Sequence, residues 1–140
     1  MSSVVFIAAA AHREIVAHCR DEFPREAVGL LGGRDGIVED AYRLANIAPA
    51  TGGLLFFLAD PYRQFLAERA IVGAGKQVVG MYHSHPGGTA VLSREDIVAC
   101  SSRIRLQIVV ALAGGKDRPV LRAYRAPSDT SIPELAIRLV

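Results

Sequence analysis

Residues 77–86 read QVVGMYHSHP, and the rest of the chain is best interpreted outward from this stretch. Its apolar part, residues 77–83, predicts a buried strand, and Pro86 would end that strand because proline has no backbone N–H. Side chains two positions apart on a strand point to the same face, so His83 and His85 would lie side by side. Two imidazoles placed in this way could bind one cation. An isolated pair of this kind, however, is more often two polar residues near the end of a strand.

Strands and helices are expected on both sides of this stretch. Further strands are predicted at residues 4–7, 26–33, 37–44, 54–58, 106–112 and 120–124. Helices are predicted at residues 11–22, 61–73 and 93–101, and residues 132–140 fit either a strand or a helix. The strands and helices do not alternate strictly. We therefore expect an α+β fold with one mixed β-sheet flanked by helices, in a single domain over residues 1–140.

The composition excludes several classes of protein. Hydrophobic residues make up 51% of the 140 residues and charged residues 21%, which excludes intrinsic disorder. A net charge of +2, 6% aromatic residues and no tryptophan argue against a nucleic-acid-binding surface. The longest apolar runs have eight residues, too few for a membrane span, and the first three residues lack the Lys or Arg of a signal peptide. Cys19 and Cys100 form no CxxC pair and are expected as buried thiols in a reducing cytoplasm.

A second group of polar residues follows the two histidines. Seven residues separate His85 from Ser93, and Ser93 and Asp96 lie in the first turn of the predicted helix at 93–101. Taken alone, this pair is best explained as a capping box that satisfies exposed N–H groups at the helix start. A carboxylate on that turn, brought back over the end of the strand, would also complete a set of two histidines and one aspartate. Zn²⁺ accepts these ligands well and keeps its fourth position for water in catalytic sites.

A zinc hydrolase also needs a base that is not itself a ligand. Glu26 is the candidate, because it begins an otherwise apolar predicted strand where a structural role would favour an apolar residue. The alternative is a solvent-exposed strand terminus beside Pro24. The remaining histidines, His12 and His18, lie six positions apart on the first predicted helix, about 240° around it, and are expected at the surface.

These residues together resemble the JAMM (MPN-plus) metallopeptidases. That family's pattern is a distant glutamate, then H-x-H-P, then S-x-x-D after seven residues, and Glu26, His83, His85, Ser93 and Asp96 occupy all five positions. The resemblance implies a JAMM-like, cytidine-deaminase-like mixed sheet, with Zn²⁺ held by His83, His85 and Asp96 and water as the remaining ligand. It also implies that Glu26 is the general acid/base and that Ser93 donates a hydrogen bond to the oxyanion of the tetrahedral intermediate.

The resemblance further implies a class of substrate. Small prokaryotic JAMM proteins resemble peptidases that act at the C-terminal glycine of ubiquitin-like or sulfur-carrier proteins, some releasing cysteine and others cleaving isopeptide bonds. We therefore expect a cytoplasmic zinc metallopeptidase whose partner is a carrier protein ending in Gly-Gly. An exposed strand beside the site would pair with the extended tail of the carrier. No nucleic acid or membrane is expected as a partner, and a homodimer is left open.

Two other functions are weighed against this one. A catalytically inactive MPN-type scaffold would usually have lost ligands, whereas Glu26, His83, His85 and Asp96 are all present. A zinc nucleobase deaminase would need H-x-E together with P-C-x-x-C, and this pair of motifs is absent. A metal assay separates the peptidase from the scaffold.

Overall fold

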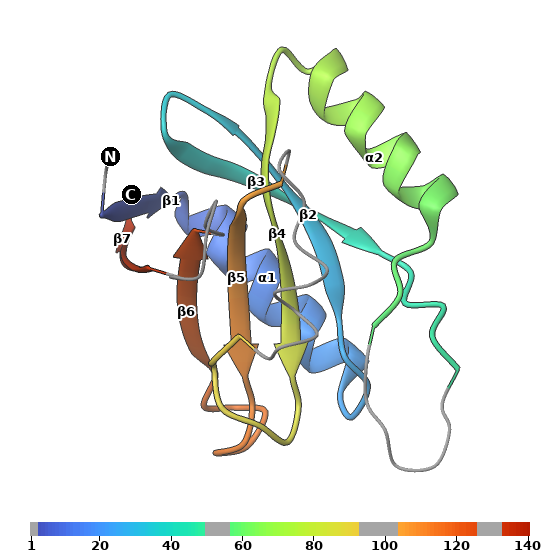
Figure 1. The fold of residues 1–140 in the computed structure, drawn as a ribbon, viewed down its shortest axis with the longest axis vertical. Helices are drawn as coiled ribbons and strands as arrows, with labels where there is room; N and C mark the ends of the chain where they lie inside the picture. The colour runs from blue at the N-terminus through green and yellow to red at the C-terminus, as the bar shows by residue number, and fades with distance from the viewer. Residues whose placement is uncertain (1–2, 50–56, 93–103, 126–132) are drawn as a thin grey trace.

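The computed structural model describes residues 3–49, 57–92, 104–125 and 133–140, which form a sheet and two helices (Figure 1). In chain order the elements are β1 (Val4–Ile7), α1 (Ala9–Glu22), β2 (Val28–Arg34), β3 (Ile37–Leu44), α2 (Pro61–Gly73), β4 (Gln77–His85), β5 (Leu106–Ala111), β6 (Val120–Arg125) and β7 (Glu134–Leu139). Neither helix is both long enough and apolar enough to cross a membrane.

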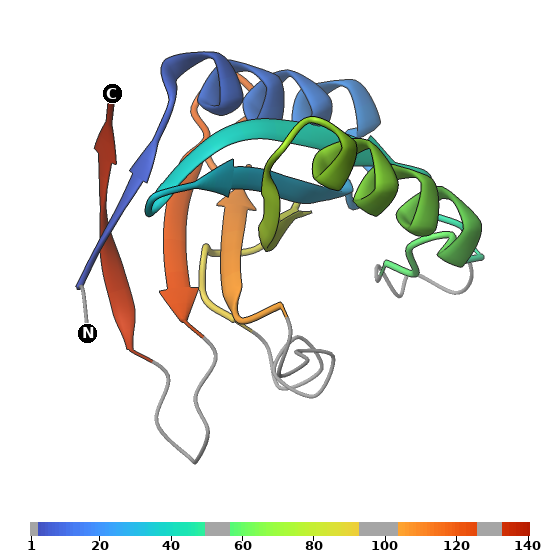
Figure 2. The same cartoon turned by 90° about the horizontal axis from the view of Figure 1, so that it is seen from above.

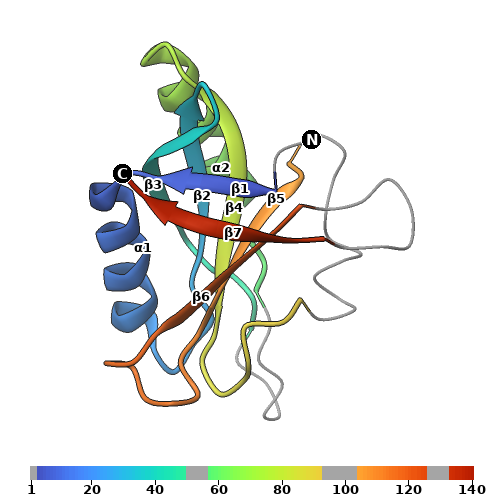
Figure 3. The same ribbon diagram turned by 90° about the vertical axis from the view of Figure 1, so that its left-hand side faces the viewer.

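The strands form one mixed sheet, which closes on itself in the order β1-β3-β2-β4-β5-β6-β7. β1 runs parallel to both β3 and β7, and β4 runs parallel to β5, whereas the other neighbours are antiparallel. Figure 3 shows the parallel pair β1 and β7 that closes the sheet. The predicted α+β fold with a mixed sheet is confirmed. Its closure was not predicted, because β1 and β7 come from opposite ends of the sequence and no local pattern indicates their pairing.

The two helices cover opposite faces of the central strands. Ile15 of α1 packs with Leu31 of β2 in the largest buried cluster, whereas Ile71 of α2 packs with Leu30 of β2 in a second cluster. Neighbouring residues on a strand point to opposite faces, so β2 is buried on both sides. This burial explains the continuous apolar run from which that strand was predicted. Figure 2 shows both helices beside the β2–β3 hairpin.

The ends of α2 follow the signals read from the sequence. Asp60 accepts a hydrogen bond from the backbone N–H of Tyr62 at 3.0 Å, and Pro61 lies in the first turn, where its missing N–H costs nothing. Gly75 follows the helix with a φ of 77°, a conformation that favours glycine. The predicted helix is therefore confirmed by its own end residues.

Several predicted elements differ from the structure or lie outside it. The strand predicted at 26–33 begins at Val28. Of the strand predicted at 54–58, only the last two residues are described, and they are not in a strand, although Ala59 forms an isolated bridge with Asn46. The helix predicted at 93–101 lies outside the described residues. The C-terminal segment, which fitted either a strand or a helix, forms β7.

The expectation that His12 and His18 lie at the surface is wrong for His18. His18 is only 2% exposed, because it lies three positions after the buried Ile15 on the same face of α1. Its Nδ1 atom is 2.6 Å from the hydroxyl of Tyr82, and its Nε2 atom is 4.0 Å from the carboxylate of Glu22. Burial lowers the pKa of His18 to about 4, so the imidazole is neutral at pH 7. With its proton on Nε2, facing Glu22, it accepts a hydrogen bond from Tyr82.

Cys19 is fully buried, as predicted, and Cys100 lies outside the described residues. Burial raises the pKa of the Cys19 thiol to about 12. The thiol is therefore protonated at neutral pH and is suited neither to nucleophilic attack nor to metal binding.

Candidate metal centre

The end of β4 brings two imidazoles together. The Nε2 atoms of His83 and His85 are 3.1 Å apart, and the centres of the two rings are 4.9 Å apart. His83 is 1% exposed and His85 is partly exposed. Ser84, between them, points to the other face of the sheet, where its hydroxyl contacts the Cys19 thiol. The alternation predicted for this strand therefore places both imidazoles on one face.

Glu26 lies opposite the two histidines because of the pairing between β2 and β4. The two strands are antiparallel, with Val28 opposite His83. Just before β2, Ala27 and Ser84 exchange two hydrogen bonds: the Ser84 N–H donates to the Ala27 carbonyl at 3.0 Å, and the Ala27 N–H donates to the Ser84 hydroxyl at 2.8 Å. This register brings the Glu26 carboxylate and one ring nitrogen of each histidine within 4.8 Å of one another.

Glu26 is 6% exposed, so the alternative of a solvent-exposed strand terminus is wrong. A carboxylate is rarely buried unless it is paired or binds a cation. Glu26 and the two imidazoles thus form a group that could hold a metal ion.

The environment of His85 favours metal binding through Nε2. Its Nδ1 atom is 2.8 Å from the carbonyl oxygen of Thr89, which can only accept a hydrogen bond. The proton of the neutral ring is therefore on Nδ1, and the lone pair on Nε2 faces His83. Two ligand nitrogens bound tetrahedrally to Zn²⁺ at about 2.0–2.1 Å lie about 3.3 Å apart, close to the 3.1 Å between these Nε2 atoms. The predicted cofactor, Zn²⁺, fits this donor set.

The loop after β4 is held in place from two sides. The Tyr124 hydroxyl on β6 donates to the carbonyl of Ala90 at 2.6 Å. Ala90 directly follows Thr89, whose carbonyl accepts the hydrogen bond from Nδ1 of His85. The His85 carbonyl accepts from Gly88 at 3.3 Å and from Leu112 at 3.1 Å. These contacts hold the Thr89 carbonyl in line with His85, a role that the sequence did not predict.

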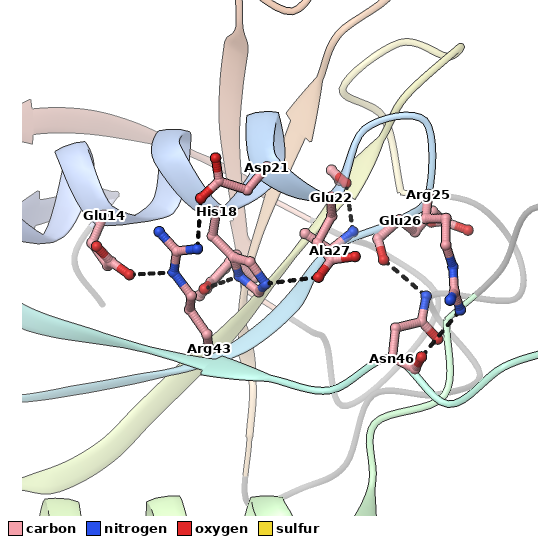
Figure 4. Close-up of polar contacts among 11 residues, drawn as sticks. Glu14, His18, Asp21, Glu22, Arg25, Glu26, Ala27, Arg43 and Asn46 are labelled. Atoms are coloured by element: carbon pink, nitrogen blue, oxygen red, sulfur yellow. Dashed lines mark hydrogen bonds and ion pairs between the residues drawn. The ribbon is translucent and has the colours of Figure 1, made fainter.

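A third side of the site comes from the segment before α2. The ring of Phe57 lies 4.7 Å from the ring of His83, tilted by 33°. Leu58 follows it, and its N–H donates to the side chain of Asn46 at 3.0 Å. Figure 4 shows Asn46 beside Arg25 and Glu26, with the hydrogen bonds that join them. Sequence reasoning missed Asn46 and Phe57, because neither belongs to a spaced motif.

Of the five predicted site residues, the structure brings Glu26, His83 and His85 together. Ser93 and Asp96 lie outside the described residues, so their predicted roles stay predictions. The capping and ligand roles of Asp96 are equally untested.

The profile of a known family, the prokaryotic homologues of the JAB domain, matches residues 8–127. The chain belongs to this family. The family named from the Glu26, H-x-H-P and S-x-x-D pattern is therefore confirmed.

Two curated relatives of this JAB-family chain are named as peptidases. The chain is 36% identical to a probable TtuB-protein conjugate cleaving protease of Thermus thermophilus. The match extends over 101 residues, which are 72% of this chain and 66% of that protein. It is 29% identical to the CysO-cysteine peptidase of Mycobacterium tuberculosis. This match extends over 126 residues, which are 90% of this chain and 84% of that protein. These relatives support the predicted class of enzyme, a peptidase-type hydrolase.

Solved structures share the fold. A protein from Desulfitobacterium hafniense has a TM-score of 0.82 and 30% identity, over 97% of this chain and 92% of that one. A structure described as a metalloprotease-like zinc site in the proteasome and signalosome has a TM-score of 0.61 and 17% identity, over 98% of both chains. At that identity the second likeness concerns the fold alone.

Proposed function

We propose that this JAB-family chain is a zinc-dependent peptidase that hydrolyses the bond after the C-terminal Gly-Gly of a ubiquitin-like or sulfur-carrier protein. The observation that carries the proposal is the buried carboxylate of Glu26 within 4.8 Å of two imidazole nitrogens on one strand end. The names of the TtuB-conjugate protease and the CysO-cysteine peptidase support the substrate class.

In this proposal His83 and His85 hold the metal through Nε2, and Asp96 supplies the third ligand. When bound, Zn²⁺ would polarise the scissile carbonyl and lower the pKa of a water molecule. The Thr89 carbonyl keeps the proton of His85 on the far side of the ring from the metal. The aromatic ring of Phe57 restricts the movement of His83 by packing against it.

Glu26 moves the proton. Its carboxylate accepts a proton from the attacking water and passes it to the nitrogen of the leaving amine, which must be protonated to depart. Because the side chain is almost fully buried, bulk water does not compete strongly for the carboxylate. The hydroxyl of Ser93 donates a hydrogen bond to the oxygen of the scissile carbonyl as negative charge develops on it.

The strand expected to pair with the substrate tail is not β4. β4 pairs with β2 on one side and with β5 on the other, up to and including His85 opposite Ala111. Pairing with an exposed strand beside the site therefore stays a prediction for a strand other than the one that carries the two histidines. The preference for glycine before the scissile bond does not depend on such pairing, since that residue lies close to the metal, where a side chain would clash.

Zinc content tests the ligand assignment. The purified protein should contain close to one zinc per chain, and Asp96→Ala should lose most of it because two imidazoles alone hold zinc weakly. Asp117→Ala, which removes an exposed aspartate from a turn, is the matched control and should keep the metal. Elemental analysis measures both. Full zinc occupancy in Asp96→Ala would exclude Asp96 as a ligand, and absence of zinc in the parent protein would favour a catalytically inactive scaffold.

Turnover tests the roles of Glu26 and Ser93. Glu26→Gln should keep zinc and lower turnover by about 10²-fold or more, because the amide cannot accept a proton. Ser93→Ala should also keep zinc, with a smaller loss than Glu26→Gln. Glu134→Gln, a change on the exposed side of β7, should leave turnover unchanged. If Glu26→Gln loses zinc while remaining folded, Glu26 is a ligand.

Substrate choice is tested by mass spectrometry. A carrier–cysteine adduct ending in Gly-Gly-Cys should be trimmed by the zinc-loaded enzyme and not by Glu26→Gln. The same adduct with the last glycine changed to alanine should be trimmed far more slowly. Rapid digestion of casein without trimming of the adduct would indicate a general protease.

The cytoplasmic location, the single domain over residues 1–140 and a homodimer remain predictions.

A further inference from the structure

Asn46 occupies a junction between two segments that border the metal site. It lies two residues after β3, and its side-chain amide donates to the backbone carbonyl of Glu26 at 2.8 Å. Its side-chain oxygen accepts from the N–H of Ala48 and from the N–H of Leu58, each at 3.0 Å. One carboxamide therefore joins three pieces of backbone.

Two of these pieces, at Glu26 and Leu58, bear on the proposed chemistry. Glu26 lies two residues before β2, outside the named strand, so the regular ladder that begins at Val28 does not by itself fix the backbone of Glu26. Leu58 directly follows Phe57, whose ring lies 4.7 Å from the ring of His83. The same side chain thus connects the proton-transferring residue to the aromatic ring on a metal ligand.

Arg25 strengthens the junction from the other side. Its guanidinium donates to the carbonyl of Asn46 at 3.1 Å (Figure 4). It also donates to the carbonyl of Ala48 at 2.9 Å. Ala27, after Glu26, is held by its two hydrogen bonds with Ser84. The backbone around Glu26 is therefore held by Ser84 toward β4 and by Asn46 and Arg25 toward the segment after β3.

We propose that Asn46 is a positioning residue, which sets the place of the Glu26 carboxylate relative to the two imidazoles and keeps Phe57 against His83. The proposal rests on the proposed function of Glu26 in proton transfer. The carboxamide meets all three demands at once, because its NH₂ group donates to the Glu26 carbonyl while its oxygen accepts from two N–H groups. Displacing a catalytic group by about 1 Å can lower a rate by about 10²-fold. Removal of the Asn46 side chain should therefore lower kcat.

The first test compares Asn46→Ala and Asn46→Asp with Gln107→Ala. Asn46→Asp keeps the acceptors for Ala48 and Leu58 but places a carboxylate oxygen against the Glu26 carbonyl. Gln107→Ala is the matched control, because it removes another amide-to-carbonyl hydrogen bond, from the side chain of Gln107 on β5 to the carbonyl of Ile104. Both Asn46 variants should keep zinc and lose about 10–10²-fold in kcat with a smaller change in KM. Gln107→Ala should keep kcat.

A double-mutant cycle shows whether the effect passes through Glu26. Asn46→Ala should lower kcat in the parent protein and have little further effect in Glu26→Gln, because a displaced base and an absent base are equivalent. An equal loss in both backgrounds would overturn the proposal, since Asn46 would then act independently of Glu26. Unchanged kcat in both Asn46 variants would overturn it as well.

A measurement without substrate separates this proposal from the proposed function. In protein loaded with Co²⁺, paramagnetic relaxation of the Glu26 carboxyl ¹³C signal, assigned with Glu26→Gln, reports the distance between the carboxyl and the metal. That relaxation should fall in Asn46→Ala and remain at the parent value in Gln107→Ala. If the parent protein cleaves no carrier adduct but this difference is found, the positioning role stands and the substrate class is wrong. Identical relaxation in the parent and in Asn46→Ala refutes the positioning role.

Discussion

Replacing His18 should flatten the dependence of stability on pH in mildly acidic solution. His18 is buried in α1 with Nδ1 on the Tyr82 hydroxyl and Nε2 4.0 Å from the Glu22 carboxylate. Arg43 of β3 faces the same region and disfavours a proton on His18, whereas Glu14 and Asp21, which bind Arg43, favour it. Burial outweighs these charges and lowers the pKa of His18 from 6.5 to about 4.

The sign and size of the effect follow from proton linkage. Because His18 binds its proton more readily in the unfolded chain, its contribution to stability is fully present above pH 6.5 and is lost as the pH falls toward 4. That interval is about 2.5 pH units, and each unit corresponds to about 1.36 kcal/mol. The free energy of unfolding should therefore fall by about 3 kcal/mol between pH 7.5 and pH 4 through His18 alone.

Urea denaturation of the metal-free protein at pH 7.5 and pH 4 measures this loss. His18→Asn keeps an oxygen acceptor near the position of Nδ1 and cannot be protonated in this range. Other groups titrate in both proteins, so the difference between the two pH dependences belongs to His18. His12→Asn, the same substitution at the half-buried histidine of the same helix, is the matched control. Parallel curves for the parent and His18→Asn would refute a buried neutral His18.

Other predictions concern the two faces of the central strands. Gly29→Ala should lower stability by about 1–3 kcal/mol, seen as a lower melting temperature, because its Cβ would lie 2.2 Å from the buried ring of Tyr82. Ser84→Ala should cost about 1–3 kcal/mol in urea denaturation by leaving the Ala27 N–H without its acceptor. Arg43→Met should cost less than about 1 kcal/mol, since Arg43, Glu14 and Asp21 are all well exposed. Cys19→Ala should leave zinc content unchanged; loss of zinc would give that thiol an unexpected role.

The sequence predicted the strand at the centre of the site better than its surroundings. His83 and His85 share a face because two-residue spacing on a strand requires it, whatever the rest of the fold. The position of Glu26 beside them depends on the pairing of β2 with β4, whose paired residues lie 44 to 55 positions apart. The sequence singled out Glu26 as a carboxylate at the start of an apolar strand, but only the family pattern placed it with the two histidines. Local periodicity gives the direction of a side chain, whereas long-range pairing decides which side chains meet.

The errors have the same origin. His18 was placed at the surface because its position was compared with that of His12 and not with the buried face of α1. Asn46 was missed because a lone asparagine between predicted strands has no spacing to recognise, and its partners Glu26 and Leu58 lie 20 and 12 positions away. Closure of the sheet through β1 and β7 likewise needed the three-dimensional arrangement.

The alternation along the end of β4 also bears on how this gene can change over time. Tyr82 and Ser84 point toward α1, while His83 and His85 point toward Glu26, so consecutive residues of β4 contribute to opposite faces of the sheet. A single inserted or deleted residue within the strand would exchange the two sets, burying the imidazoles under the helix and turning the tyrosine and serine toward the metal. A change in the length of this strand therefore removes the site and the core beneath it in one step.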